Sequence, residues 1–204
     1  MAALKGRNLL SLADLTADEM MRLITTAAKI KSGEINPQCP HKILGLVFKK
    51  ASTRTRVSFT AAMYKLGGQV IDLNANLTQI GRGEPTADTA RVLDRYLDVL
   101  AIRTYDQSEV EEFAKHSSIP ILNALTDLEH PCQILADLLT VQEEFGSCKG
   151  QTMTYLGDGN NVAHSLILGC ALAGMNVRVA TPKGYEPDSA IVEKAQALSG
   201  GNSE

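Results

Sequence analysis

The residues best suited to chemistry form the segment Ser52-Thr53-Arg54-Thr55-Arg56, in which two arginines alternate with hydroxyl side chains. An apolar run that predicts a buried strand precedes the segment, and a predicted helix from Val57 to Leu66 follows it. The first turn of that helix already carries partial positive charge from the helix dipole, so it is an unfavourable place for cations. A bound phosphate would remove the conflict, because free N–H groups, hydroxyls and guanidinium groups all bind its oxygens. The simpler alternative is an ordinary helix start with solvated arginines.

Further polar side chains follow two later predicted strands. Arg103 and Thr104 end the third strand, and Asn123, His130 and Gln133 lie at or after the end of the fourth. Ligands of open α/β sheets bind beyond the carboxyl ends of the strands. We therefore expect these groups and the Ser52–Arg56 segment to face one edge of the sheet.

Each of these residues also has a simpler explanation. Arg103 can pair with a carboxylate, His130 can cap the helix that Pro131 begins, and Gln133 can be an exposed helix residue. The sequence GDGNN at residues 157–161 follows a predicted strand but lacks the G-x-G-x-x-G pattern, so it does not indicate dinucleotide binding. The combination of these features is stronger evidence than any single one.

Strands and helices alternate along the chain. Strands are predicted at Ile43–Phe48, Val70–Leu73, Asp98–Arg103, Ile119–Ala124, Met153–Leu156 and Val177–Thr181, and helices from Thr55, near Thr86, and from Ser108, Pro131, Val162 and Asp188. Capping boxes at Thr16–Glu19 and Ser108–Glu111 mark the starts of two helices. Apolar strands that alternate with helices predict an α/β fold, with a parallel sheet covered by helices on both faces.

A change in composition near residues 145–151 suggests a domain boundary. We expect a first domain at residues 1–147, and at 148–204 an incomplete second Rossmann-like α/β domain, because only two strands and two helices follow the break. The chain is therefore expected to stop inside its second domain.

The composition excludes several classes of protein. The 204 residues are 44% hydrophobic and 21% charged with a net charge of −3, which is typical of a globular protein and gives no basic field for nucleic acid. The four cysteines lack the spacing of a metal site, and the longest apolar run is too short to span a bilayer. We expect reduced thiols, no membrane segment and a cytoplasmic location, or an organellar matrix if a transit peptide has been removed.

Several motifs together resemble the ornithine carbamoyltransferase family. They are STRTR after the first strand, GRGEPTADTARVL, IRT, HPCQ, and GDGNNVAHS followed by ATPKGYEPD, and they occur in the family's order over almost the whole chain. STRTR and HPxQ are typical of transcarbamylases in general, whereas GDGNN and KGYEPD point to the ornithine branch. The resemblance implies carbamoyl transfer from carbamoyl phosphate to the δ-amino group of L-ornithine, a step of arginine biosynthesis, without metal or organic cofactor.

The resemblance also implies a role for each matching residue. The carbamoyl phosphate site would comprise Ser52, Thr53, Arg54, Thr55, Gln79, Arg103, His130 and Gln133. Of these, Arg54, Arg103 and His130 would be catalytic, because they would stabilise charge on the departing phosphate and on the carbonyl oxygen. Asn161 would contact ornithine. The family is typically built on trimers, in which the loop that carries Gln79 reaches a neighbouring subunit's site.

Two features depart from the family's pattern. A glutamate commonly stands at the position of Lys49, so this chain lacks an expected ion-pair partner for Arg54. The family's later ornithine-binding segments also have no counterpart before Glu204. Three hypotheses therefore stand: an ornithine carbamoyltransferase seen as a partial chain, a carbamoyl phosphate or phosphate-binding fragment without turnover, or a transcarbamylase for another amine such as putrescine, aspartate or an acylated ornithine.

Overall fold

The computed structural model describes residues 4–74 and 77–199, which form two compact units. The first unit comprises Met1–Leu10 and Asn36–Asp127, and the second comprises Ser11–Ile35 and Leu128–Glu204. These units differ from the predicted division at residue 147, because α1 (Ala17–Ser32) and α5 (Pro131–Phe145) pack together and α5 also packs on α6 (Asn161–Ala173). The domain boundaries 1–147 and 148–204 of the complete protein stay a prediction.

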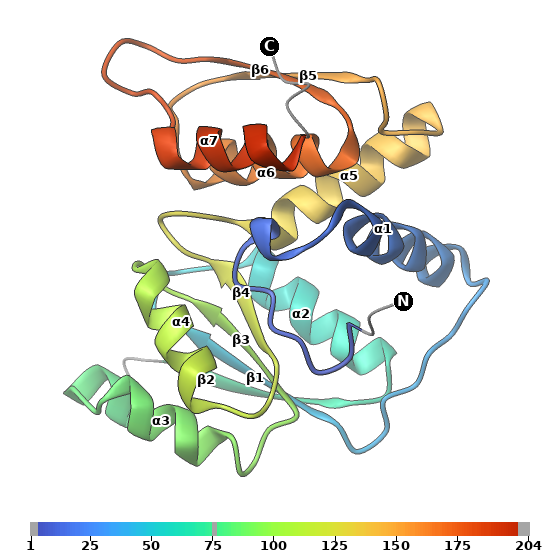
Figure 1. Ribbon diagram of the computed structural model, residues 1–204. Helices are drawn as coiled ribbons and strands as arrows, with labels where there is room; N and C mark the ends of the chain where they lie inside the picture. The colour runs from blue at the N-terminus through green and yellow to red at the C-terminus, as the bar shows by residue number, and fades with distance from the viewer. Residues whose placement is uncertain (1–3, 75–76, 200–204) are drawn as a thin grey trace. The chain divides into compact units, whose positions relative to one another are not determined.

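The first unit is built on a four-stranded parallel sheet in the order β2-β1-β3-β4. Its elements are β1 (Ile43–Phe48), α2 (Arg54–Lys65), β2 (Gln69–Asn74), η3 (Gln79–Arg82), α3 (Thr86–Leu93), β3 (Val99–Arg103), α4 (Gln107–His116) and β4 (Ile121–Leu125) (Figure 1). The chain before the second unit adds one parallel bridge, between Leu9 and Leu122, to the open edge of β4.

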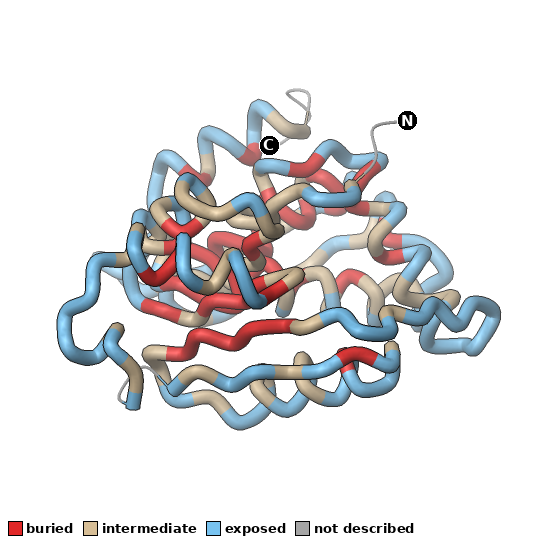
Figure 2. Tube along the Cα trace, turned by 90° about the horizontal axis from the view of Figure 1, so that it is seen from below, coloured by how far each residue is buried: buried red, intermediate tan, exposed pale blue. Residues whose placement is uncertain are grey.

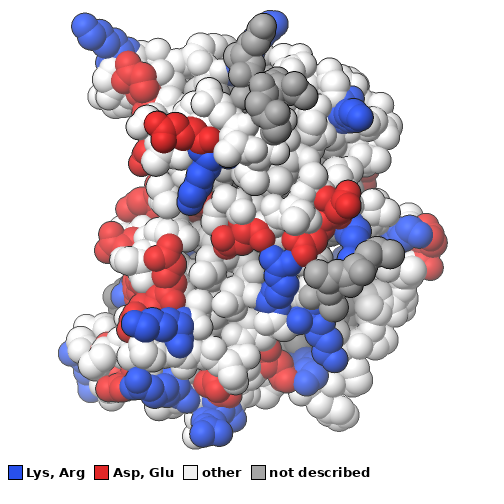
Figure 3. Space-filling view, viewed as in Figure 1, with Lys and Arg blue, Asp and Glu red and all other residues white. Residues whose placement is uncertain are grey.

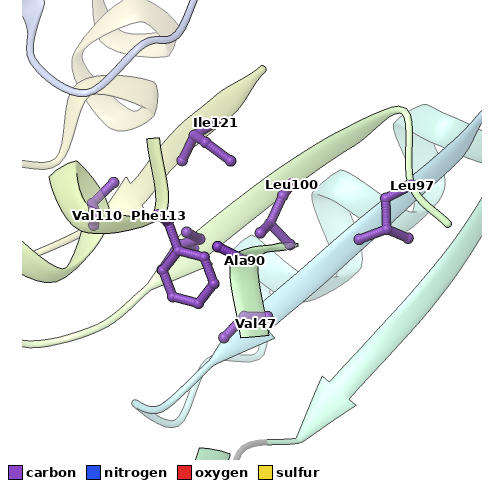
Figure 4. Packing of buried hydrophobic residues seen from close by; sticks show 8 residues of the cluster. Val47, Ala90, Leu97, Leu100, Val110, Phe113 and Ile121 are labelled. Carbon is purple, nitrogen blue, oxygen red and sulfur yellow. The ribbon is translucent and has the colours of Figure 1, made fainter. Parts of the chain in front are cut away.

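Helices cover both faces of this sheet. Successive strand residues point to opposite sides, so the strands present apolar side chains to the helices on each face. On one side, Val47, Leu100 and Ile102 pack against Ala90 of α3 and against Val110 and Phe113 of α4 (Figure 4). On the other side, Leu44, Leu46 and Phe48 pack against Met63 of α2. Strands β1, β3 and β4 are largely buried, whereas the edge strand β2 contains only exposed and half-buried residues (Figure 2).

The second unit places a helix at its centre. Its elements are η1 (Leu12–Asp14), α1, α5, β5 (Thr152–Leu156), α6, β6 (Asn176–Ala180) and α7 (Ser189–Leu198), with β5 and β6 paired in parallel. Helix α6 packs against β6, α7, α5 and α1, and its residues from Ala163 to Cys170 are all buried. An apolar helix of this kind is expected at the centre of a packed unit.

The structure confirms the predicted fold class and corrects one helix start. All six predicted strands are present within two residues of their expected ends, and both sheets are parallel. The predicted helix starts from Thr55 onward lie within one residue of the observed ones, whereas the range that begins at Val57 starts three residues after the first residue of α2, Arg54. The Thr16–Glu19 capping box forms as predicted, with hydrogen bonds of 3.2 Å and 3.0 Å. The Ser108–Glu111 capping box is wrong, because α4 begins at Gln107 with Asp106 at its N-cap.

Charged side chains of both signs are mixed on the surface. On the face of the first unit drawn in Figure 3, lysine and arginine side chains lie among aspartate and glutamate side chains. Ion pairs such as Lys42–Asp98 at 2.6 Å and Arg91–Asp88 at 2.9 Å account for part of this mixing. Among residues 4–74 and 77–199, no helix has both the length and the apolar character needed to cross a membrane.

Gly169 tests the packing of the central helix. A Cβ at this position would lie 2.6 Å from Ile134 Cγ2 and 3.3 Å from Leu138 Cδ1, both on α5. Helix propensity alone predicts that Gly169→Ala stabilises α6 by about 1 kcal/mol. Overpacking against a β-branched side chain predicts the opposite sign, a loss of about 1–3 kcal/mol in the free energy of unfolding. Urea unfolding decides between them, and a stabilised variant would show that α5 and α6 do not approach this closely.

Candidate active site

The two central strands of the first unit send their following helices to opposite faces of the sheet. Helix α2 follows β1 and packs on the side of Leu44, Leu46 and Phe48. Helix α4 follows β3 and packs on the opposite side, which carries Val47. The chain therefore diverges between the carboxyl ends of β1 and β3, and open α/β sheets bind ligands at such a switch point. The predicted Ser52–Thr55 segment and Arg103 are the residues that follow or end these two strands.

Arg103 is the last residue of β3 and is partly buried. It lies opposite Phe48 of β1, and the pairing with β4 shifts by one residue between Ile102 and Arg103. Such an irregularity re-aims the side chain at the end of a strand. Within the described part of the chain, the buried Nε of Arg103 has no hydrogen-bond partner. Burial, and then the nearby charge of Arg54, lower the pKa of Arg103.

Arg54 is the first residue of α2 and is exposed. Thr53 occupies the N-cap position without a capping side-chain bond, and the first turn contains no acidic residue. The first backbone hydrogen bond of the helix runs from Val57 N–H to Thr53 O at 3.0 Å, so the earlier N–H groups remain available to a ligand. Neither Arg54 nor Arg103 forms an ion pair with a carboxylate of residues 4–74 and 77–199, which rules out the simpler explanation for Arg103 among those residues.

Arg56 has a different role from Arg54. Its guanidinium group pairs with Asp72 of the neighbouring strand β2, and its Cζ lies 4.9 Å from the centre of the Phe48 ring. Arg56 therefore connects the start of α2 to the sheet, and Asp72 balances its charge. Of the two arginines in the helix turn, only Arg54 needs an anion to balance its charge.

Lys49, which stands where the family commonly has glutamate, is neutralised by another element. Its ammonium group pairs with Glu109 of α4, and Glu109 also accepts a hydrogen bond from Thr104 Oγ1. The backbone N–H of Lys49 donates to Arg103 O at 2.9 Å. Lys49 thus adds no uncompensated charge, and the Arg54–Arg103 pair remains the local excess of positive charge.

The other predicted residue of the first unit, Gln79, begins the short helix η3 and is exposed. Asn123, which the sequence placed among the polar groups at the sheet edge, is instead fully buried in β4. Its side-chain amide donates to Leu10 O at 2.9 Å and to Gln107 Oε1 at 3.2 Å. Asn123 therefore anchors the N-terminal segment.

The remaining three predicted residues belong to the second unit. His130 holds the N-cap position of α5 without a capping bond from its side chain, and its backbone N–H donates to Ser165 Oγ at 2.8 Å. Gln133, in the first turn of α5, is exposed and donates to Asp137 Oδ1 at 2.9 Å. Asn161 is the first residue of α6 and is half-buried, while Asn160 before it caps the helix.

The GDGNN and KGYEPD motifs lie against each other. Gly159 of GDGNN donates its backbone N–H to Tyr185 O of KGYEPD at 2.7 Å. A Cβ on Gly159 would lie 2.2 Å from Pro187 N, so only glycine permits this approach. The close contact sets the position of the turn that leads into Asn161.

A buried carboxylate that the sequence did not single out lies beside His130. Glu129 is 1% exposed and accepts hydrogen bonds from Ser11 Oγ, from Leu12 N–H at 3.2 Å and from Ser165 Oγ at 3.1 Å. Burial raises the pKa of Glu129, and these three hydrogen bonds oppose the shift. The polar pair His164–Ser165 inside the apolar run of α6 was the signal in the sequence for a buried polar network.

Comparisons with known proteins cover almost the whole chain. Residues 7–143 match the profile of the aspartate/ornithine carbamoyltransferase carbamoyl-P binding domain, and residues 149–203 match that of the Asp/Orn binding domain. The ornithine carbamoyltransferase of a Nostoc species is 67% identical over 204 residues, and that of a Synechocystis species is 66% identical over 196 residues. These alignments cover 100% and 96% of this chain.

Solved structures agree with the sequence comparison. The ornithine carbamoyltransferase of Pyrococcus furiosus superposes with a TM-score of 0.93 at 46% identity over 98% of this chain and 65% of that one. The enzyme of Gloeobacter violaceus gives a TM-score of 0.88 at 56% identity over 95% of this chain and 64% of that one. The chain spans 66% of the length of the Nostoc relative and 63% of the Synechocystis relative.

The raised pKa of Glu129 predicts how stability changes with pH. Since the folded pKa lies above the unfolded value, the unfolded state loses its proton first, and stability falls as pH rises from the unfolded pKa to the folded one. Glu129→Gln removes this fall, so the stability of the variant relative to the unsubstituted chain should increase between pH 4 and pH 7. Urea unfolding at both pH values measures it.

The matched variant is Glu129→Ala, which leaves the Ser11, Leu12 and Ser165 donors without their acceptor. It should lower the free energy of unfolding by about 1–3 kcal/mol at either pH. Parallel pH curves for Glu129→Gln and the unsubstituted chain would contradict a titrating, desolvated carboxyl at this position.

Proposed function

The chain belongs to the aspartate/ornithine carbamoyltransferase family, and on that premise we propose that the complete protein is an ornithine carbamoyltransferase. It transfers the carbamoyl group of carbamoyl phosphate to the δ-amino group of L-ornithine and so produces L-citrulline and phosphate. The names of the most similar relatives support ornithine as the acceptor, and the contact between the GDGNN and KGYEPD motifs agrees with that branch.

The single observation that carries the proposal is the pair of guanidinium groups at the switch point. Arg54 and Arg103 are close enough for their charges to interact, and neither pairs with a carboxylate of the described residues. Like charges are unfavourable at short distance unless an anion lies between or beside them. A phosphate group with two negative charges suits this place, because guanidinium groups bind its oxygens in bidentate geometry and the open first turn of α2 adds N–H donors.

Each predicted residue then has a defined part in the reaction. Ser52, Thr53, Arg54 and Thr55 hold the phosphate, and Arg103 bridges it to the carbonyl oxygen of the carbamoyl group. His130 donates to the same oxygen, Gln133 binds the carbamoyl amide and Asn161 contacts ornithine. In the reaction, the neutral amine nitrogen bonds to the carbonyl carbon, the carbon–oxygen bond to phosphate breaks, and phosphate leaves with the electron pair while the amine loses a proton to solvent. Donors aimed at the developing oxyanion are worth about 3 kcal/mol each.

The proposal extends to assembly and cellular context. The complete protein forms a homotrimer in which Gln79, exposed at the start of η3, reaches the site of a neighbouring copy. It acts in arginine biosynthesis in the cytoplasm, and its four free cysteines suit such a reducing compartment.

A second candidate concerns the 204-residue chain by itself. Because this chain spans 66% of the Nostoc relative, it lacks the counterpart of the remaining third, where most ornithine contacts of the family are expected. The Arg54–Arg103 site is nevertheless present. The chain alone is then a carbamoyl phosphate or phosphate-binding unit without turnover.

Citrulline formation tests the two candidates together. The complete protein, supplied with carbamoyl phosphate and L-ornithine, should form citrulline and phosphate in equal amounts, whereas the 204-residue chain should bind phosphate without forming citrulline. Aspartate, putrescine and N-acetyl-ornithine serve as alternative acceptors in the same assay. Faster carbamoylation of any of them would move the protein to another branch of the family, and citrulline formation by the short chain would exclude the binding-only candidate.

Calorimetric titration with inorganic phosphate tests the site residues. Arg54→Ala and Arg103→Ala should each weaken binding by at least about 1.5 kcal/mol, because each removes a charge-assisted hydrogen bond. Arg56→Ala is the matched control, since it removes the same charge two residues from Arg54 but breaks the pair with Asp72 instead. Its phosphate affinity should stay within about 0.5 kcal/mol, as expected for a solvent-screened charge. Equal losses for all three variants would show a diffuse electrostatic effect in place of a defined site.

A further inference from the structure

Two consecutive polar residues, His164 and Ser165, lie inside the most buried helix of the second unit. They are 7% and 0% exposed, and the rest of α6 from Ala163 to Ala173 consists of apolar residues and glycine. Buried polar groups persist in such places when their hydrogen bonds are complete. Both side chains make their bonds to the segment Leu128-Glu129-His130 that leads into α5.

The partners of His164 determine which ring nitrogen carries its proton. The backbone N–H of Asp188 points at Nε2 at 3.0 Å and can only donate, so Nε2 is the acceptor. Nδ1 lies 2.9 Å from Leu128 O, which can only accept, so Nδ1 carries the proton. His164 is therefore held as the neutral Nδ1–H tautomer. Its two hydrogen bonds connect Leu128 with Asp188, the N-cap residue of α7.

Ser165 forms two hydrogen bonds with the same segment, one with His130 and one with Glu129. Its Oγ accepts the backbone N–H of His130 at 2.8 Å, and its hydroxyl proton is directed at Glu129 Oε2 at 3.1 Å. Glu129 in turn is bonded to Ser11 Oγ and to Leu12 N–H, so it cannot shift without breaking other bonds. The backbone of His130 is thus connected through one hydroxyl to a buried, anchored carboxylate.

We propose that Ser165, anchored by Glu129, is a positioning residue that sets where the His130 imidazole meets the reacting carbonyl oxygen, and that His164 fixes the other end of the same three-residue segment. This inference rests on the proposed function. Because α6 also begins with Asn161, one helix sets the place of both the carbonyl-oxygen donor and the predicted ornithine contact. A displacement of about 1 Å in such a donor can reduce the rate by about two orders of magnitude.

Steady-state kinetics of the complete protein test the role of Ser165. A donor that acts on the transition state affects kcat more than substrate binding, so Ser165→Ala should lower kcat at least about tenfold and change KM for carbamoyl phosphate less than about threefold. Glu129→Gln keeps an acceptor for Ser165 Oγ and Leu12 N–H, so it should retain more activity than Glu129→Ala. Thr140→Ala is the matched control, because the Thr140 hydroxyl donates within α5, to Ala136 O at 3.1 Å.

Calorimetry with inorganic phosphate separates positioning from loss of folded protein. The phosphate-binding groups Ser52–Thr55 and Arg103 belong to the first unit, so Ser165→Ala should bind phosphate with unchanged stoichiometry and affinity. A reduced stoichiometry that accounts for the whole loss of kcat would overturn the positioning role and leave only a structural one.

Nitrogen-15 NMR of the histidine-labelled chain tests the tautomer independently of turnover. The chain has four histidines, and the signals that vanish in His164→Gln identify the ring. Shifts typical of a protonated Nδ1 and an unprotonated Nε2 at neutral pH are expected. An Nε2–H tautomer or a charged ring would overturn the proposed arrangement around His164.

The outcomes distinguish the inference from the proposed function. If the unsubstituted protein forms citrulline and Ser165→Ala is equally fast, the positioning role is wrong while the function stands. If the unsubstituted protein forms no carbamoylated product with any acceptor, the function and the positioning role both fail, whereas the NMR result still reports the state of His164.

Discussion

The arrangement of the site depends on the unfavourable proximity of two positive charges, Arg54 and Arg103. The first begins a helix and the second ends a strand, and their backbones are held by apolar packing on opposite faces of one sheet. The nearby carboxylates Asp72 and Glu109 are already engaged by Arg56 and Lys49, so they do not relieve the repulsion. Packing therefore supports an electrostatic conflict that the proposed phosphate would resolve, and a fold can in this way be stable and still be prepared for a ligand.

The sheet and the start of α2 could be predicted because their signals are local. Strand β1 is buried on both faces, and its unbroken apolar run showed this directly. The N-cap of α4 was predicted at Ser108, two residues after the observed Asp106. The Ser108–Glu111 pattern is a local signal too, but contacts with distant residues prevail over it. Gln107 uses its side chain to bind Thr126 at 2.8 Å and Asn123 at 3.2 Å, contacts that a single window of sequence does not reveal.

The residues that sequence reasoning missed make contacts far along the chain. Glu129 binds Ser165, 36 positions away, and Ser11, 118 positions away. Arg56 finds Asp72 on the adjacent strand, which a view of the helix turn alone could not show. The strand-end rule predicts the general place of chemistry, whereas the partners that orient each side chain depend on the three-dimensional packing.

The Lys49–Glu109 pair has a consequence for the divergence of this family. The resemblance to the family implies an acid at the first position, and the lysine there is acceptable in this chain because α4 supplies the opposite charge. The residues at positions 49 and 109 should then vary together. Relatives with an acid at position 49 do not need an acid at position 109, whereas relatives with a base at position 49 do. Their joint variation would record how the charge balance around the site was conserved while its individual members changed.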